Sequence, residues 1–203
     1  MRSNERFNFQ RAPHTEVEPH AGTLLLAHPT LKDPNFSKTV ILLSAHSEGE
    51  GSVGIIVNRP SDQTLKEVDP NFREKLDSED ERELLEDIPI FWGGPVAREH
   101  LILVAWKWCL DESSFKLYFG MQAERAGQII EEDPEFRLLG FMGHAGWTEG
   151  QLSSEIASDS WILSNALPYL HSDAVQIDWL SLVGSERPDL RLLALAPDEP
   201  SLN

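Results

Sequence analysis

Short apolar runs separated by polar turns dominate the first part of the chain. The segments GTLLLAH (22–28), TVILLSAH (39–46) and SVGIIVNRP (52–60) are rich in leucine and β-branched residues. Runs of this length and composition predict buried β-strands. The polar, glycine-containing link between the second and third runs predicts an antiparallel hairpin, and Pro60 predicts the end of the third strand. The Asp33-Pro34-Asn35 sequence predicts a turn before the second strand.

Further strands are predicted in the second half, where they alternate with segments of helical periodicity. Apolar runs at 88–92, 99–108, 115–120 and 135–147 predict four more strands, and WILS (161–164) predicts a short one.

Helices are predicted where the apolar residues recur every three or four positions. One or two short helices with solvated outer faces are expected in the charge-dense segment 61–87. Others are expected at 121–133, 148–161, 165–173 and 174–184. Thr148 followed by Gln151 matches a capping box, which places Thr148 at the N-cap of the helix predicted at 148–161.

This order of elements favours an α+β fold with a mostly antiparallel sheet flanked by helices over a doubly wound parallel sheet, because the strands come first in hairpins and are later interleaved with helices. A chain of 203 residues is long enough for one well-packed domain. We expect a flexible N-terminal arm at 1–20, a single domain at 21–186 and a C-terminal tail at 187–203, because both ends are polar and contain prolines.

Charge and cysteine content limit the classes of function. The chain has 17 lysine and arginine residues against 34 aspartate and glutamate residues, a formal net charge of -17. This balance argues against direct nucleic-acid binding, which depends on basic residues. Cys109 is the single cysteine, so no internal disulfide can form, as expected in a reducing cytosol. No run of apolar residues is long enough to span a membrane, and no signal peptide is apparent. We therefore expect a cytoplasmic protein.

Motifs with a known catalytic or metal-binding mechanism are absent from the sequence. There is no CxxC or HExxH metal pattern, no phosphate-binding glycine loop and no G-x-S-x-G nucleophile elbow. His144 could approach Ser153 and Ser154 across the start of a helix, but a catalytic triad needs geometry that spacing does not show. We predict no metal, no cofactor and no catalytic residue.

Glycine-aromatic corners and one strand end supply a candidate pocket. Arg59, after Asn58, could hold a carboxylate or phosphate, or could pair with a surface acid. Trp92 beside Gly93-Gly94 and Trp147 beside Gly146 are interpreted as rings packed where glycine lets backbones approach, with a ligand platform as the alternative. The candidate pocket residues are Asn58, Arg59, Gly93, Gly94, His144, Gly146, Trp147 and Gln151.

Several segments in the same order resemble the YqgE/AlgH family of bacterial proteins. They are residues 22–60, FWGGPV (91–96), GHAGWTEGQLSSEI (143–156) and SWIL (160–163). The resemblance implies a compact α+β domain with a partly barrel-like sheet and a cytosolic location, but no established reaction. Some members carry the label of transcriptional regulators. The family pattern commonly has another residue, such as tyrosine, at the position of His144, which argues against a histidine mechanism.

Two hypotheses of function follow. The first is a non-enzymatic binding or regulatory protein that acts through an unknown protein or small-molecule partner, so that any effect on transcription is indirect. The alternative is an enzyme for a small anionic substrate, with Arg59 as an anion clamp and His144 or Glu149 as the proton carrier. The enzyme hypothesis requires those side chains to converge on one cleft.

Overall fold

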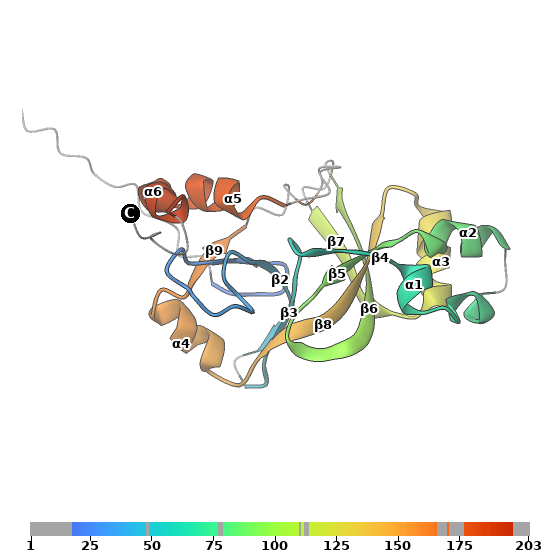
Figure 1. The fold of residues 1–203 in the computed structure, drawn as a ribbon, viewed down its shortest axis with the longest axis horizontal. Helices are drawn as coiled ribbons and strands as arrows, with labels where there is room; N and C mark the ends of the chain where they lie inside the picture. The colour runs from blue at the N-terminus through green and yellow to red at the C-terminus, as the bar shows by residue number, and fades with distance from the viewer. Residues whose placement is uncertain are drawn as a thin grey trace, which may run out of the picture.

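The computed structural model describes residues 18–47, 49–76, 79–109, 111, 114–165, 170 and 177–196. Its strands form one strongly curled sheet in the middle of the molecule (Figure 1), and helices lie at both ends. The strands are β1 (Leu24–Ala27), β2 (Val40–Ser47), β3 (Gly51–Ile56), β4 (Pro60–Thr64), β5 (Pro89–Trp92), β6 (Val96–Cys109), β7 (Ser114–Met121), β8 (Arg137–Trp147) and β9 (Trp161–Ser164). The helices are α1 (Leu65–Val68), η1 (Phe72–Lys75), α2 (Glu79–Glu86), α3 (Ala123–Glu132), α4 (Gln151–Ala157), α5 (Trp179–Glu186), η3 (Pro188–Leu190) and α6 (Arg191–Ala194).

The sheet has the order β4-β5-β8-β3-β2-β1-β9, and β6 pairs with both β8 and β7. Among the described strands, β5 and β8 form the one parallel pair, and the other pairs are antiparallel. The predicted hairpin is the β2–β3 pair. The predicted α+β class with a mostly antiparallel, partly barrel-like sheet is thus confirmed.

Strand β8 belongs to both halves of the curled sheet. Its first part pairs with β5 and β6, and its last part, from Ala145 to Trp147, pairs with β3. Gly143 lies between the residues that pair with β5, which end at Met142, and those that pair with β3, which begin at Ala145; its φ of 71° is a conformation that glycine adopts without strain. A Cβ at this position would lie 2.6 Å from the carbonyl oxygen of Gly94. The change of partner at Gly143 lets one strand serve two parts of the sheet.

Buried side chains from both faces of the sheet form three clusters. Successive residues of a strand point to opposite faces, so the fully buried β1 contributes Leu24 and Leu26 to one cluster and Leu25 and Ala27 to another. The first cluster lies inside the curl and under α5, and the second lies between the sheet and α4. The third packs α1, η1, α2 and α3 against β5, β6 and β8. Helices therefore cover the sheet on both sides, which accounts for the uninterrupted apolar strands.

Two strand boundaries differ from the sequence prediction by three or more residues. Strand β3 ends at Ile56, and Pro60 begins β4 instead of ending the preceding strand. The first residue of an edge strand tolerates proline because its missing N–H is not needed there. Strand β6 begins at Val96, three residues before the predicted start, with a register shift between Val96 and Leu101.

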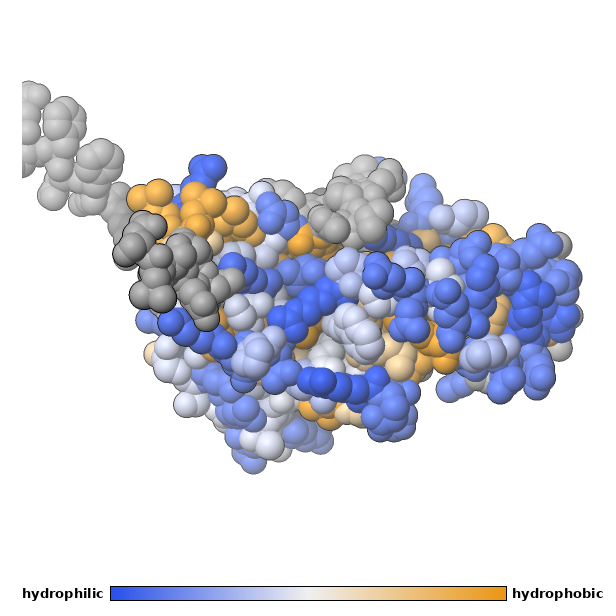
Figure 2. All heavy atoms as spheres, in the orientation of Figure 1, coloured by the Kyte–Doolittle hydropathy of each residue, from blue (hydrophilic) through white to orange (hydrophobic). Residues whose placement is uncertain are grey.

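In the described part of the chain, helices lie in the predicted regions 61–87, 121–133 and 148–161, but the first region begins with strand β4 and the predicted cap of α4 is wrong. The acidic segment 61–87 contains β4 and then α1, η1 and α2, whose exposed surface is hydrophilic at that end of the molecule (Figure 2). Helix α4 begins at Gln151 with Gly150 as its N-cap, not Thr148. Only the reach-back half of the expected box forms, since the Thr148 N–H donates to Gln151 Oε1 over 3.0 Å.

The segment expected to be a tail contains short helical turns in its described part. η3 and α6 follow α5 directly, and Ala194 of α6 is buried in the cluster under α5. Leu192, Leu193 and Leu195 are exposed and coincide with the apolar surface over α6 in Figure 2. Most of the predicted helix at 165–173 lies outside the described residues, as does most of the predicted arm at 1–20. Helix α5 overlaps the helical region predicted at 174–184 and ends two residues later, at Glu186.

Candidate functional site

The turn before β2 is built around Asp33, as its sequence predicted. The Asp33 carboxylate accepts a hydrogen bond from the backbone N–H of Asn35 over 2.8 Å, and its carbonyl accepts from the N–H groups of Phe36 and Ser37. Phe36 packs against the rings of Trp147 and Trp161. The turn therefore fixes Phe36 on an aromatic cluster and holds Asn35 in a defined position next to it.

Asn58 and Arg59 attach this turn to the end of β3. The Asn58 side chain accepts from the N–H of Val40 over 2.8 Å and donates to the carbonyl of Lys38 over 2.9 Å. The Arg59 guanidinium donates to the backbone carbonyls of Asn35 (2.8 Å), Ser37 (3.1 Å) and Pro34 (3.2 Å).

The environment of Arg59 corrects the interpretation that it pairs with a surface acid. Its hydrogen-bond partners are carbonyl groups, and in the described residues no carboxylate forms an ion pair with it. Burial lowers the pKa of the Arg59 guanidinium, while Asp33 acts in the opposite direction at longer range. Arginine retains its charge in proteins, so Arg59 is a partly desolvated cation held in one orientation.

The Gly93-Gly94 segment lies between β3 and β8 where these strands separate. Gly93 donates to the carbonyl of Met142 and accepts from the N–H of Ile56, both over 2.8 Å. A Cβ on Gly94 would lie 2.1 Å from the carbonyl carbon of His144. The close backbone approach predicted for these glycines is confirmed.

Trp92, next to these glycines, is not packed as predicted. It is the last residue of β5 and donates its backbone N–H to the carbonyl of Arg59 over 2.8 Å. Trp92 is 48% exposed, although Ile90 and Phe91 before it are buried. The indole lies at the surface, where it is available to a ligand.

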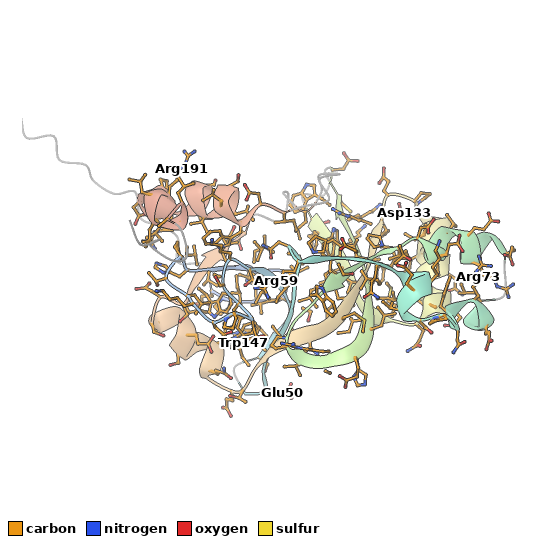
Figure 3. All side chains as sticks on the ribbon, viewed as in Figure 1. Glu50, Arg59, Arg73, Asp133, Trp147 and Arg191 are labelled. Atoms are coloured by element: carbon orange, nitrogen blue, oxygen red, sulfur yellow. The ribbon has the colours of Figure 1, made fainter. Side chains whose placement is uncertain are left out.

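A pocket of about 270 Å³ opens beside Trp92. It is lined by Asn35, Ile56, Arg59, Trp92, Gly94, Pro95 and Arg98. Arg98 donates to the Asn35 side-chain oxygen over 2.8 Å, so Asn35 bridges the two arginines through its backbone and side-chain oxygens. Figure 3 shows Arg59 near the middle of the molecule, in the region between the two ends that carry helices. The pocket combines two guanidinium groups with an apolar wall of Ile56, Trp92 and Pro95.

Arg98 and Asn35 were not among the predicted site residues. They are 63 positions apart in the chain and come from a turn and from the irregular start of β6. The sequence signal that could have indicated Arg98 is its place four residues after Gly93-Gly94, close to the exposed Trp92.

Trp147 and Gln151 belong to a different arrangement, centred on Glu155 of α4. One oxygen of Glu155 accepts from the indole N–H groups of Trp147 (2.9 Å) and Trp161 (2.7 Å), and the other accepts from the Gln151 amide (2.9 Å). Trp147 is buried and lies beside α4 (Figure 3), as predicted for a packed ring. Glu155 fastens α4 to the sheet.

The remaining predicted residues are distributed over other surfaces. His144 pairs with Val96 in the β6–β8 ladder, and none of the hydrogen bonds found among the described residues involves its ring. Gly146 and Trp147 line a wide, open groove that also contains His46, whereas Asn58 lines a hollow beside Trp179. Of the eight predicted pocket residues, Arg59 and Gly94 line the pocket beside Trp92.

His46 makes a contact that the sequence did not indicate. Its Nδ1 lies 2.8 Å from the hydroxyl of Ser52, which faces it directly across β2 and β3. Ser52 is 5% exposed and lines the same groove as His46, and its hydroxyl is engaged with the His46 ring. Ser153 and Ser154 lie on α4, and no hydrogen bond in the described part of the chain joins them to His144.

The described residues contain neither a metal-binding cluster nor a membrane-spanning helix. No group of three or more histidine, cysteine, aspartate or glutamate side chains is arranged to hold a metal ion there. No helix in that part of the chain has both the length and the apolar character needed to cross a membrane.

Comparison with known proteins identifies relatives across nearly the whole chain. The UPF0301 protein of Chlorobium luteolum is 31% identical over 192 residues, which is 90% of this chain and 94% of that protein. The UPF0301 protein SCO2948 of Streptomyces coelicolor is 33% identical and covers 93% of this chain and 98% of its own length.

Two solved structures share the fold. Protein DIP2367 from Corynebacterium diphtheriae superposes with a TM-score of 0.62 at 22% identity, covering 89% of this chain and 94% of that one. The solution structure of the AlgH protein from Pseudomonas aeruginosa gives a TM-score of 0.59 at 24% identity and covers 92% and 100%. The family model described as DUF179, AlgH-like, matches residues 24–185. The chain therefore belongs to the AlgH-like family, the YqgE/AlgH family that the sequence motifs resemble.

Proposed function

We propose that this protein is a cytosolic, non-enzymatic binding protein, and that the pocket at Arg59 and Arg98 takes a small anion. The observation that carries the proposal is the state of these two arginines. Both line one pocket, and among the described residues neither forms an ion pair with a carboxylate. Acidic residues outnumber basic ones by 34 to 17 in this chain, so carboxylates are abundant partners elsewhere. Two adjacent guanidinium groups without a carboxylate supply the charge that an anionic ligand would neutralise.

Other basic side chains show the contrast. Lys66 pairs with Asp87, Arg73 with Glu79, and Arg187 with Asp189, all at the surface. At the pocket, Asp33 is the acidic group that acts on Arg59, and its carboxylate is hydrogen-bonded to the N–H of Asn35.

The lining of the pocket supports binding over catalysis. Its side chains are an amide, two guanidinium groups, an indole and apolar groups, together with glycine, so none of them is a proton carrier or a nucleophile at neutral pH. The enzyme alternative needs His144 or Glu149 beside the anion bound at Arg59. His144 does not line this pocket, and Glu149 lines a hollow with His46 and Ser153.

A regulatory role fits this proposal as an indirect one. Binding of the anion would change how the protein contacts a protein partner, while the net charge of -17 opposes direct contact with DNA. The label of transcriptional regulator, which the family resemblance suggested, would then describe a consequence of partner binding.

Substitution of Arg98 tests the proposal without dismantling the fold. Arg98 is exposed, and its one described hydrogen bond is to Asn35, whereas Arg59 holds three backbone carbonyls. We expect at least one of acetate, inorganic phosphate, benzoate and phenyl phosphate to bind the wild-type protein in calorimetric titration. Arg98→Ala should weaken that binding by about 10–100-fold, the effect of losing a charge-assisted hydrogen bond.

The control is Arg125→Ala, which removes the same charge from α3, where Arg125 pairs with Glu132. This variant should bind the anion as the wild-type protein does. If none of the four anions binds, or if the Arg98 and Arg125 variants behave alike, the pocket is not an anion site.

A further inference from the structure

We infer that the ligand of this pocket is a small anion carried on a flat ring, with the anionic group between Arg59 and Arg98 and the ring against Trp92. This inference rests on the proposed function and names its ligand class. A simple ion would leave the apolar half of the pocket unoccupied.

Trp92 supplies a free aromatic face. The residue is 48% exposed, and among the described residues no aromatic ring stacks on its indole and no cation lies over it. By contrast, three other tryptophans are buried and pack against aromatic rings: Trp106, Trp147 and Trp161. An exposed indole at the edge of a pocket leaves apolar area in water that a stacked ring would cover.

The backbone around Trp92 holds its position. Its N–H is bonded to the carbonyl of Arg59, and Gly93 after it is bonded on both sides, to Met142 and to Ile56. The backbones that carry the Trp92 indole and the Arg59 guanidinium are thus joined directly by a hydrogen bond where β4 and β5 pair. A pocket that is already formed loses less conformational entropy when a ligand binds.

The rest of the lining divides into a charged part and an apolar part. Arg59, Arg98 and Asn35 provide hydrogen-bond donors, while Ile56, Trp92 and Pro95 provide apolar surface. Inorganic phosphate or acetate would contact the charged part alone and leave the apolar part wet. A ring bearing a carboxylate or phosphate contacts both, which is the usual composition of small-molecule sites.

The size of the pocket limits the ligand. Its volume of about 270 Å³ lies just below the ~300–1,000 Å³ that is common for ligand pockets. One ring with its anionic group fits this space better than a dinucleotide or a long acyl chain.

The test compares ringed and ringless anions on the same protein. Benzoate is matched with acetate, phenyl phosphate with inorganic phosphate, and cyclohexanecarboxylate serves as an apolar ring that is not flat. We expect the better of the two aromatic anions to bind about tenfold more tightly than its ringless counterpart and more tightly than cyclohexanecarboxylate. The carboxylate and phosphate pairs show which anionic group the arginines prefer.

Variants at Trp92 locate the ring. Trp92→Ala should reduce the advantage of the aromatic anion to within about threefold, and Trp92→Phe should retain most of it. Tyr118→Ala, which removes another exposed aromatic side chain (39% exposed) on β7, should leave it unchanged. Thermal unfolding of each variant shows whether the fold is retained.

The outcomes separate this inference from the proposed function. Equal affinity for ringed and ringless anions, with loss of both in Arg98→Ala, would overturn the ring and leave the anion site intact. Binding of cyclohexanecarboxylate as tight as that of benzoate, or an aromatic preference that survives Trp92→Ala, would also overturn it. No binding of any of the five anions would contradict both proposals.

Discussion

Arg59 and Arg98 show how residues of one type serve two purposes in the same pocket. Arg59 is partly buried and donates to three backbone carbonyls of the turn at residues 33–38, which precedes β2. It therefore stabilises this turn and also places a positive charge at the pocket. Arg98 is exposed and is bonded to one side-chain oxygen. The difference predicts that Arg98 variants change binding alone, whereas Arg59 variants change binding and stability together.

The sequence located some of these residues without giving their roles. Asn58 and Arg59 were recognisable because an amide and a cation follow an apolar strand, but their partners are backbone groups about 20 positions earlier. No local pattern reports such contacts. Trp92 was predicted to pack beside glycine, yet its exposure depends on where neighbouring elements end, which the sequence does not show.

Gly94 provides a test at the level of one residue. A Cβ there would lie 2.1 Å from the carbonyl carbon of His144 and 2.2 Å from its oxygen, and backbone atoms cannot move aside cheaply. We expect Gly94→Ala to lower the free energy of unfolding by about 2–3 kcal/mol, measured by urea denaturation.

The matched control is Gly49→Ala, because a Cβ at Gly49 would meet no atom within 4 Å. Its effect should stay within about 0.5 kcal/mol. Equal stability of the two variants would show that Gly93-Gly94 does not pass close to β8.

At the level of elements, β8 and α4 show what organises the fold. Strand β8 pairs with β5, β6 and β3, and the change of partner occurs at Gly143. The strand itself was predictable from its apolar pattern. Its several partners were not, because pairing between segments far apart in the chain depends on packing of the whole sheet. The predicted N-cap of α4 was also wrong. Gly150, with a φ of 71°, takes the N-cap position that Thr148 was expected to fill.

Glu155 provides the test at this level. It accepts from Trp147, Trp161 and Gln151, and Glu155→Gln replaces one of its acceptor oxygens by a donor group. Because Glu155 is only partly buried, we expect a loss of about 1–2 kcal/mol in the free energy of unfolding. Denaturation followed by tryptophan fluorescence measures it.

Glu149→Gln is the control for the change of charge. Glu149 is exposed, lies just before α4 and makes no side-chain bond among those described. Its substitution should leave stability nearly unchanged. If both variants unfold at the same denaturant concentration, the Glu155 hydrogen bonds do not fasten α4.

At the level of the whole molecule, the pattern of apolar and polar positions predicted more than catalytic or metal-binding motifs did. The alternation of apolar runs and helical segments was sufficient for the α+β class, and the family motifs agreed with it. The candidate site was predicted less well, because its lining comes from the 33–38 turn, the end of β3, the end of β5 and the start of β6. In an acidic chain, a place where two cations face a pocket without carboxylates is visible only after folding.

The most direct test of the account is to locate the bound anion. In heteronuclear NMR of the isotope-labelled protein, titration with phenyl phosphate and with benzoate should shift the indole N–H of Trp92 and the backbone amides of Gly94 and Arg98. In Arg98→Ala, the indole N–H of Trp92 and the backbone amide of Gly94 should shift only at anion concentrations about 10–100-fold higher. Shifts centred on the groove at His46 and Ser52, or no shifts at all in the wild-type protein, would contradict an anion site between Arg59 and Arg98.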